Sequence, residues 1–262
     1  MSPGVGYVAG QPGDHTNQTF VINLYRELLG REPDPQGETF WMNLLGANGA
    51  NTNMRAVVIR GFLNSPEYAQ HYVTTVYETF LGRAPDAAGL QFQVGLLESR
   101  HDLTIALIDI AGSQEYFLRN GGTNQSFVDA LYRDLFGRPA DAAAASWVSY
   151  LNGAGAGQRH PVTRDDVVRG MLFSSEGLQK LFNGNFESLT GSTPNASAGD
   201  SQHGAYALAN VTGNGFANLF FQGNLNQAAI NYIVAQLQKS GGRNPNVTDV
   251  LANLLAGDQF YG

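Results

Sequence analysis

An eleven-residue segment occurs three times in this chain, at 24–34, 76–86 and 131–141. The tyrosine in the second position of each copy gives the spacing: 52 residues from Tyr25 to Tyr77, and 55 residues from Tyr77 to Tyr132. A period of this length is typical of stacked supersecondary units, none of which can bury its apolar face alone. The repeat therefore predicts one continuous array rather than a single catalytic domain.

The residues around each copy have the spacing of an amphipathic helix. In the first copy Phe20, Leu24 and Leu28 recur every four residues, with Val21 and Leu29 beside them. This stripe predicts a helix with one buried face. The equivalent stripes in the other copies are Tyr72, Val73, Val76, Phe80 and Leu81, and Phe127, Val128, Leu131, Leu135 and Phe136. A glycine follows each stripe, and we expect it to end the helix in a left-handed conformation.

Two more helices are expected in each copy. An aspartate stands four residues after each glycine, where its carboxylate can accept a hydrogen bond from an unpaired amide and start a second helix. We expect the second helices to bury Phe40, Trp41 and Leu44; Phe92 and Leu96; and Trp147 and Leu151. Third helices are expected over 54–63, 103–111 and 165–173, the last with a capping box of Thr163 and Asp166. A serine-initiated short helix then follows, at 65–68, 113–116 and 174–177.

The chain divides into four parts by composition. Residues 1–17 form a polar tail without the basic and apolar regions of a cleavable signal peptide. Residues 18–182 hold the three clear repeats, 183–203 a turn-rich loop, and 204–262 a degenerate fourth repeat without the Gly-Arg and Pro-Asp pairs. We predict an all-α array of about four repeats, each of roughly 50–55 residues. No apolar run is long enough to span a membrane.

Composition excludes several function classes. With 22 acidic and 15 basic residues the net charge is −7, so nucleic acid is not an expected partner. The absence of cysteine excludes disulfides, thiolate metal sites and cysteine nucleophiles. The five histidines have no metal-ligand spacing, and no hydrolase or phosphate-binding motif occurs, so we expect no enzyme and no cofactor. Charged residues make up only 14% of the chain, which is typical of exported, self-associating proteins.

The motif Leu-Tyr-Arg-x-Leu-Leu-Gly-Arg-x-Pro-Asp-x-x-Gly, an aromatic residue ten or eleven positions after its first Gly, and a closing Ser-Pro-Glu-Tyr together resemble the DUF4214 family. The resemblance covers 18–177 well and 204–262 loosely. The third copy departs from it by placing its proline at Pro139 and by carrying Ala144 instead of the last glycine.

The resemblance implies a helical domain of bacterial exported and cell-surface proteins, often found beside calcium-binding RTX repeats or in surface-layer and adhesin proteins. The chain is also similar to the helical anchoring region of some surface-layer proteins, which holds lattice subunits on outer-membrane polysaccharide. A more distant similarity is to the linker domains of phycobilisomes.

The repeated motif supplies the candidate site residues: Tyr25, Gly30, Arg31 and Asp34; Tyr77, Gly82, Arg83 and Asp86; and Tyr132, Gly137, Arg138 and Asp141. The arginines are expected to satisfy helix-end carbonyls or to pair with a carboxylate, and a ligand site is the alternative. The aspartates are expected to cap helices, and binding of Ca²⁺ by Asp34, Asp86 and Asp141 is the alternative. The tyrosines are expected in the core, whereas Tyr116, Phe117, Tyr150 and Tyr261 are the aromatic residues expected at the surface.

The functional expectation is a non-enzymatic structural or attachment module, extracellular or at the cell surface. It would assemble with itself, as an oligomer or lattice, or anchor a larger assembly. The alternatives are a glycan-binding module and a linker that docks a larger complex. The loops at 48–53, 153–162 and 183–203, which vary between repeats, are the expected places for specific contacts.

Overall fold

The computed structural model describes residues 17–46, 52–153, 161–174, 176–177 and 180. Every regular element within these ranges is a helix, which confirms the predicted all-α repeat array. The helices, in chain order, are α1 (Asn17–Leu29), α2 (Pro35–Leu45), α3 (Thr52–Leu63), α4 (Pro66–Leu81), α5 (Ala87–Arg100), α6 (Thr104–Ala111), α7 (Gln114–Arg119), α8 (Asn124–Leu131), the π-helical η1 (Tyr132–Phe136), α9 (Ala144–Leu151) and α10 (Arg164–Leu172).

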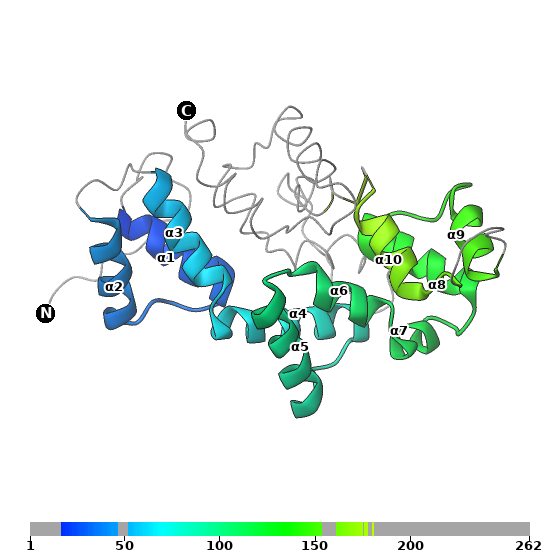
Figure 1. The fold of residues 1–262 in the computed structure, drawn as a ribbon, viewed down its shortest axis with the longest axis horizontal. Coiled ribbons are helices and arrows are strands. Elements are labelled where there is room, and N and C mark those ends of the chain that lie inside the picture. Colours follow the sequence, from blue (N-terminus) through cyan, green and yellow to red (C-terminus); the bar gives the residue numbers. More distant parts are fainter. Residues whose placement is uncertain (1–16, 47–51, 154–160, 175, 178–179, 181–262) are drawn as a thin grey trace, which may run out of the picture.

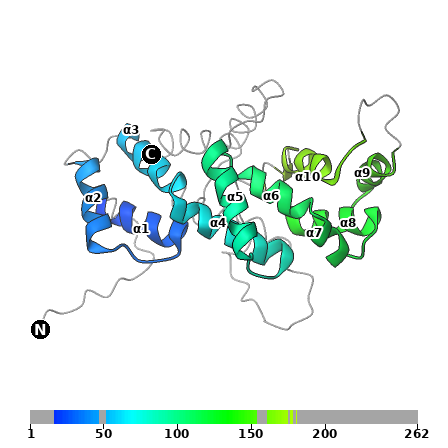
Figure 2. The same cartoon turned by 60° about the horizontal axis from the view of Figure 1, so that its bottom comes forward.

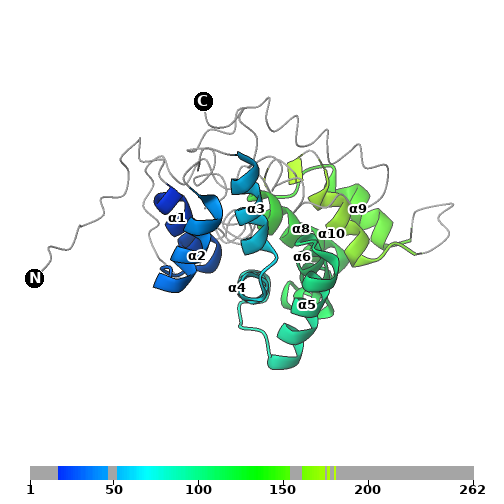
Figure 3. The same ribbon diagram turned by 60° about the vertical axis from the view of Figure 1, so that its left-hand side comes forward.

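The helices form three successive units. Figure 1 shows α1, α2 and α3 at one end, α4, α5 and α6 in the middle, and α8, α9 and α10 at the other end, and the turned view of Figure 2 keeps this order. Helix α4 joins the first two units, because it packs against α1 and α3 and also against α5 and α6. Figure 3 shows α4 nearly end-on. None of the described helices is long and apolar enough to span a membrane.

The predicted stripe of the first helix is the core of each unit. Val21, Leu24 and Leu28 of α1 are buried, as are the remaining residues expected on this face in all three copies. The three motif tyrosines are buried with them. The third helices also lie close to their expected positions, and the capping box of Thr163 and Asp166 is present at the start of α10. Except for Asn17, with which α1 begins, the predicted tail, the 183–203 loop and the degenerate fourth repeat lie outside the described residues.

The junctions between units differ from the expected short helix. The helix that begins after Ser65 does not stop: it continues through the first helix of the second unit as the 16 residues of α4. The corresponding helix after Ser113 is the six-residue α7, which ends before Gly121 and Gly122. Both glycines have positive φ, and Thr123 then caps α8. The first junction is therefore one continuous helix and the second is a broken one.

The second helices pack Trp41, Leu44, Trp147 and Leu151 against the core as expected, but in the first two units one expected residue faces outward. Phe40 and Phe92 were predicted in the core, but each is 61% exposed. The inward positions are those one residue later, Trp41 in α2 and Gln93 in α5, together with Leu45 and Leu97 one turn further on. Two adjacent aromatic residues cannot both face the core of a helix, because successive side chains point about 100° apart.

In the first and third units a glycine on the third helix leaves room for the inward tryptophan. The Trp41 ring stacks on Phe62 with centroids 4.8 Å apart and lies over Gly61, where a Cβ would be 2.5 Å from Cη2. Trp147 lies over Gly170 in the same way, where a Cβ would be 2.7 Å from the same ring atom. The first and third units thus share a packed pair of tryptophan on glycine.

Adding a methyl group at Gly61 should therefore destabilise the protein. Alanine normally stabilises a helix relative to glycine, but at Gly61 the new Cβ would displace a tryptophan ring that is stacked on Phe62, at a cost of about 1–3 kcal/mol. Gly95 in α5 is the matched control, since a Cβ there would meet no described atom within 4 Å. Thermal unfolding should show a lower Tm for Gly61→Ala and an unchanged or higher Tm for Gly95→Ala; equal effects would contradict the packing argument.

Candidate functional site

The motif arginines form the same ion pair in all three units. Arg31, which follows the end of α1, donates from Nε and Nη2 to the two carboxylate oxygens of Glu67, at 2.5 and 2.9 Å. The equivalent pairs are Arg83 with Glu115, at 2.6 and 2.6 Å, and Arg138 with Glu176, at 2.6 and 2.7 Å. We call this two-point pairing the arginine clamp; it matches the planar guanidinium to the planar carboxylate.

Each clamp arginine also lies over the motif tyrosine of its own unit. The guanidinium carbon is 4.8 Å from the ring centroid of Tyr25, 5.2 Å from that of Tyr77 and 4.9 Å from that of Tyr132. Nη1 of Arg31 donates to the carbonyl of Glu32, and the other two arginines make the same bond to the following residue. The cation therefore has an aromatic face below it and acceptors around its edge.

The motif aspartates are helix caps in the first two units. Asp34 accepts a 2.8 Å hydrogen bond from the amide of Gly37, and Asp86 accepts an equal bond from Gly89. These glycines are needed because the hydroxyls of Tyr25 and Tyr77 lie where their Cβ atoms would be. The tyrosine ring thus reaches from the core to the first turn of the second helix.

The third unit modifies this arrangement at Ala144. Its methyl group stands where the other units have glycine, and α9 begins only at this residue, after a turn at 141–143. Asp141 accepts hydrogen bonds from the amide of Ala143 at 2.9 Å and from the hydroxyl of Tyr132 at 3.4 Å. The replacement of glycine by Ala144 therefore goes with a shorter second helix, while the pairing of Arg138 with Glu176 is kept.

Motif glycines end the first helices as expected. Gly30, Gly82 and Gly137 have φ of 66°, 61° and 70°, the left-handed region that glycine enters at little cost. The turn directs the next residue, the arginine, toward the start of the following unit. The candidate residues of each motif therefore come together at one place, and each has a structural contact.

Charge distribution at the clamp favours its ionised form. The hydrogen bond from Arg31 lowers the pKa of Glu67, and Arg83 does the same for Glu115. The backbone bonds from Gly37 and Gly89 lower the pKa of Asp34 and Asp86. These carboxylates are thus held as anions by donors of the protein itself.

The calcium alternative is not tested by this geometry. Asp34, Asp86 and Asp141 lie in three separate units; Asp34 and Asp86 each have an oxygen engaged in a helix cap, and Asp141 has one engaged by the amide of Ala143 in the turn before α9. Within the described residues no three side chains of His, Asp or Glu are grouped closely enough to hold a metal ion. Calcium binding at these aspartates stays a prediction.

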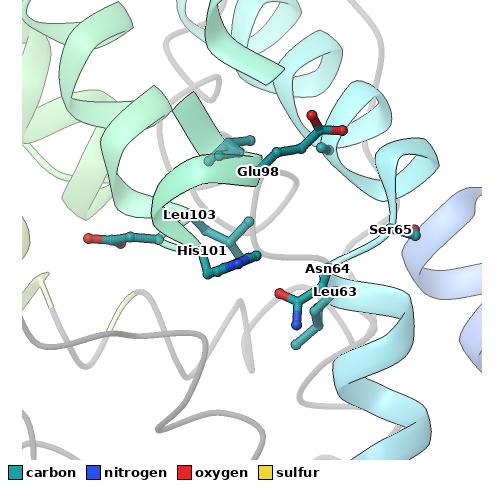
Figure 4. A pocket seen from close by; sticks show the side chains of 9 residues that line it. Leu63, Asn64, Ser65, Glu98, His101 and Leu103 are labelled. Carbon is teal, nitrogen blue, oxygen red and sulfur yellow. The ribbon is translucent and has the colours of Figure 1, made fainter. Parts of the chain in front are cut away.

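Two hollows lined by described residues bear on ligand binding. The first, of about 10 Å³, lies where α3 meets α4 and the end of α5, with Asn64, Ser65, Glu98 and His101 on its wall. Figure 4 shows these side chains around it. Such a volume holds about one water molecule rather than a ligand. The second is an open groove of about 690 Å³ between the second and third units, bounded by Asp109, Gly112, Asn124 and Asp165.

Surface aromatic residues differ from those expected. Tyr116 was predicted at the surface but is completely buried, and its hydroxyl donates to Asp134 at 2.7 Å. Phe117 is half-buried, Tyr150 is exposed as expected, and Tyr261 lies outside the described residues. Phe40 and Phe92 were missed as surface residues. The sequence shows that each phenylalanine lies ten residues after its motif glycine. It does not show which face of the second helix turns toward the core.

Comparison with known sequences yields one family. A profile described as "Domain of unknown function (DUF4214)" matches residues 9–72, 68–120 and 109–181, one match for each repeat. No curated protein and no solved structure matches.

The clamp should contribute measurably to stability. We expect a double-mutant cycle with Arg138→Gln and Glu176→Gln to give a coupling energy of about 1 kcal/mol, because the pair is two-point and only about a third exposed. The single-contact pair of Arg26 and Glu32 is the control and should give a smaller coupling. Chemical denaturation measures both, and equal couplings would count against a special role for the clamp.

Acid should loosen the first two clamps. The folded pKa of Glu67 and Glu115 lies below the ordinary 4.5, so their stabilisation is complete above pH 4.5 and is lost as pH falls through the lowered values. Tm measured from pH 6 to pH 3 should fall below about pH 4.5. The fall in Tm should be smaller for the double variant Glu67→Gln/Glu115→Gln. The variant Glu78→Gln, at an exposed position, should show the same fall in Tm as the wild type. An identical profile for all three proteins would show that acid acts elsewhere.

Proposed function

Because this chain belongs to the DUF4214 family, whose function is unknown, we propose that it is a non-enzymatic structural or attachment module of the bacterial cell surface. It would assemble with copies of itself or anchor a larger partner. The motif itself supports this reading, since its tyrosines, arginines and aspartates are engaged in holding the units together. Contacts with a partner would then use residues outside the motif.

The observation that carries the proposal is the repeated exposed phenylalanine. Phe40 and Phe92 occupy the same position of successive units, and both are 61% exposed. One turn to either side the neighbours are exposed and uncharged, Gln36 and Asn43 around Phe40 and Ala88 and Gly95 around Phe92. Large apolar side chains on a weakly charged surface are the usual anchors of a protein contact.

A matched substitution tests this surface. The third unit carries Ser146 at the same position, if Trp147 is aligned with Trp41 because both pack on a glycine. The double substitution Phe40→Ser/Phe92→Ser therefore gives the first two units the serine that the third unit has at this position. We expect its self-association, followed by sedimentation velocity over a range of concentrations and by electron microscopy, to weaken roughly tenfold or more.

Leu118→Ser is the control, because Leu118 is also 61% exposed but does not recur in the other units. Loss of assembly in both variants would mean that surface apolarity in general is responsible. Undiminished assembly of the double variant would contradict the proposed surface.

Glycan binding is the second candidate, and the same two rings favour it. Sugar faces pack on exposed aromatic rings flanked by uncharged polar residues, as at Phe40. Retention of a monomeric wild-type protein on polysaccharide, lost in Phe40→Ser/Phe92→Ser and kept in Leu118→Ser, would support this candidate over self-assembly.

A further inference from the structure

Helix α5 carries apolar residues on both of its faces. Leu90, Val94 and Leu97 pack on the core of the second unit. On the other side Phe92 is 61% exposed, and Leu96 beside it is only half-buried. A surface helix of a globular protein is usually polar on its outward face, whereas a helix that is apolar all round is covered on both sides. The outward face of α5 therefore has the composition of a contact surface.

This face places an aromatic ring next to an empty space. Gly95 lies one helical turn after Phe92 on the same face, and a Cβ there would meet no described atom within 4 Å. Ala88 and Ser99, one turn further out in either direction, are small and exposed. A second helix can therefore come close to α5 on either side of the ring, because the distance between packed helices depends on the side chains at the contact.

Packing of an aromatic ring on a glycine is already used inside this protein. Trp41 lies over Gly61 in the first unit, and the third unit repeats the pair. The second unit has Gln93 and Asp109 at these two positions, so it lacks the internal pair. Its exposed ring and its open glycine are instead neighbours on one helix, where they lie side by side and cannot pack on each other. A second copy of α5 supplies the missing half to each.

The charges of α5 suit an antiparallel partner. Asp86 caps its start and Arg100 lies in its last turn, and both are exposed. When the ring of each helix lies opposite the glycine of the other, Arg100 of one copy comes next to Asp86 of the other at both ends of the pair. Glu98 then faces the uncharged stretch from Ala87 to Gln91 rather than its own copy. The antiparallel orientation also places the positive end of each helix dipole beside the negative end of the other.

We propose that two copies of this chain pair through α5 in antiparallel orientation, with each Phe92 ring packed on Gly95 of the other copy. The proposal rests on the self-association proposed above and assigns the contact to the second unit, because α2 has Asn43 where α5 has Gly95. Figures 1 and 3 show α5 reaching the lower edge of the described array. Its 14 residues span only about 21 Å, so a single pair is a small interface and a weak one.

Cysteine cross-linking of the full chain tests this register, because the chain has no cysteine of its own. The antiparallel pair places position 88 of one copy opposite position 99 of the other, whereas the two copies of position 88 lie at least about 16 Å apart. A disulfide needs Cα atoms within about 7 Å. Mild oxidation should therefore convert Ala88→Cys/Ser99→Cys into covalent dimers and leave each single cysteine variant largely monomeric.

Substitution of the glycine tests the packing of the ring. Gly95→Ala should keep or raise the Tm of dilute protein, yet weaken pairing in sedimentation velocity roughly tenfold, because the two-fold pair would meet the extra methyl group twice. Asn43→Ala in α2 is the matched control and should associate as the wild type does. Phe92→Ser alone should reproduce most of the loss expected for Phe40→Ser/Phe92→Ser, and Phe40→Ser alone should cause little.

The outcomes separate this pair from the wider proposal. Association that requires the two phenylalanines but is unchanged in Gly95→Ala, with no cross-linking of the double cysteine variant, would overturn the α5 pair and leave the proposed surface standing. Efficient cross-linking of the single cysteine variants would show parallel pairing and overturn the antiparallel one. A wild-type chain that stays monomeric at all concentrations would overturn both the pair and self-assembly.

Discussion

The arginine clamp is the interaction on which the array depends. The guanidinium of Arg31 lies on the tyrosine of its own unit and pairs with Glu67, which lies in the first turn of the helix that follows that unit, α4. Because this glutamate lies in the first turn of the helix, the helix dipole also stabilises its negative charge. One residue thus connects the core, the end of the first helix and the start of the following unit. The same pairing recurs in the other two units, as Arg83 with Glu115 and Arg138 with Glu176.

Much of this arrangement could be predicted from the sequence. The apolar stripe of the first helix, the left-handed glycines and the aspartate caps each follow from a local rule; the stripe and the glycines are present in all three units, and the caps in the first two. The partner of each arginine could not be derived in the same way. Glu67 is 36 residues from Arg31, and only the fold brings the two together. Repetition was the one available signal, because Ser-x-Glu occurs once in each unit, as Gly-Arg does.

The sequence was misleading where two side chains compete for one place. Phe40 and Trp41 are both apolar, and Trp41 is the one that packs on Gly61 of another helix. Tyr116 was expected at the surface, but Phe80 and Phe127 lie against its ring, and its hydroxyl donates a hydrogen bond to Asp134. Such choices depend on tertiary neighbours, which override local pattern.

The two junctions have a consequence for the shape of the whole array. From Ser65 to Tyr77 there are 12 residues and from Ser113 to Tyr132 there are 19, a difference of seven, or about two helical turns. The nearly constant repeat period conceals this difference, because the stretch between the motif glycine and the serine is four residues shorter in the second unit. The clamps are unchanged on either side. The junction between two units can therefore change its length by about two helical turns while the pairing of arginine and glutamate keeps its geometry.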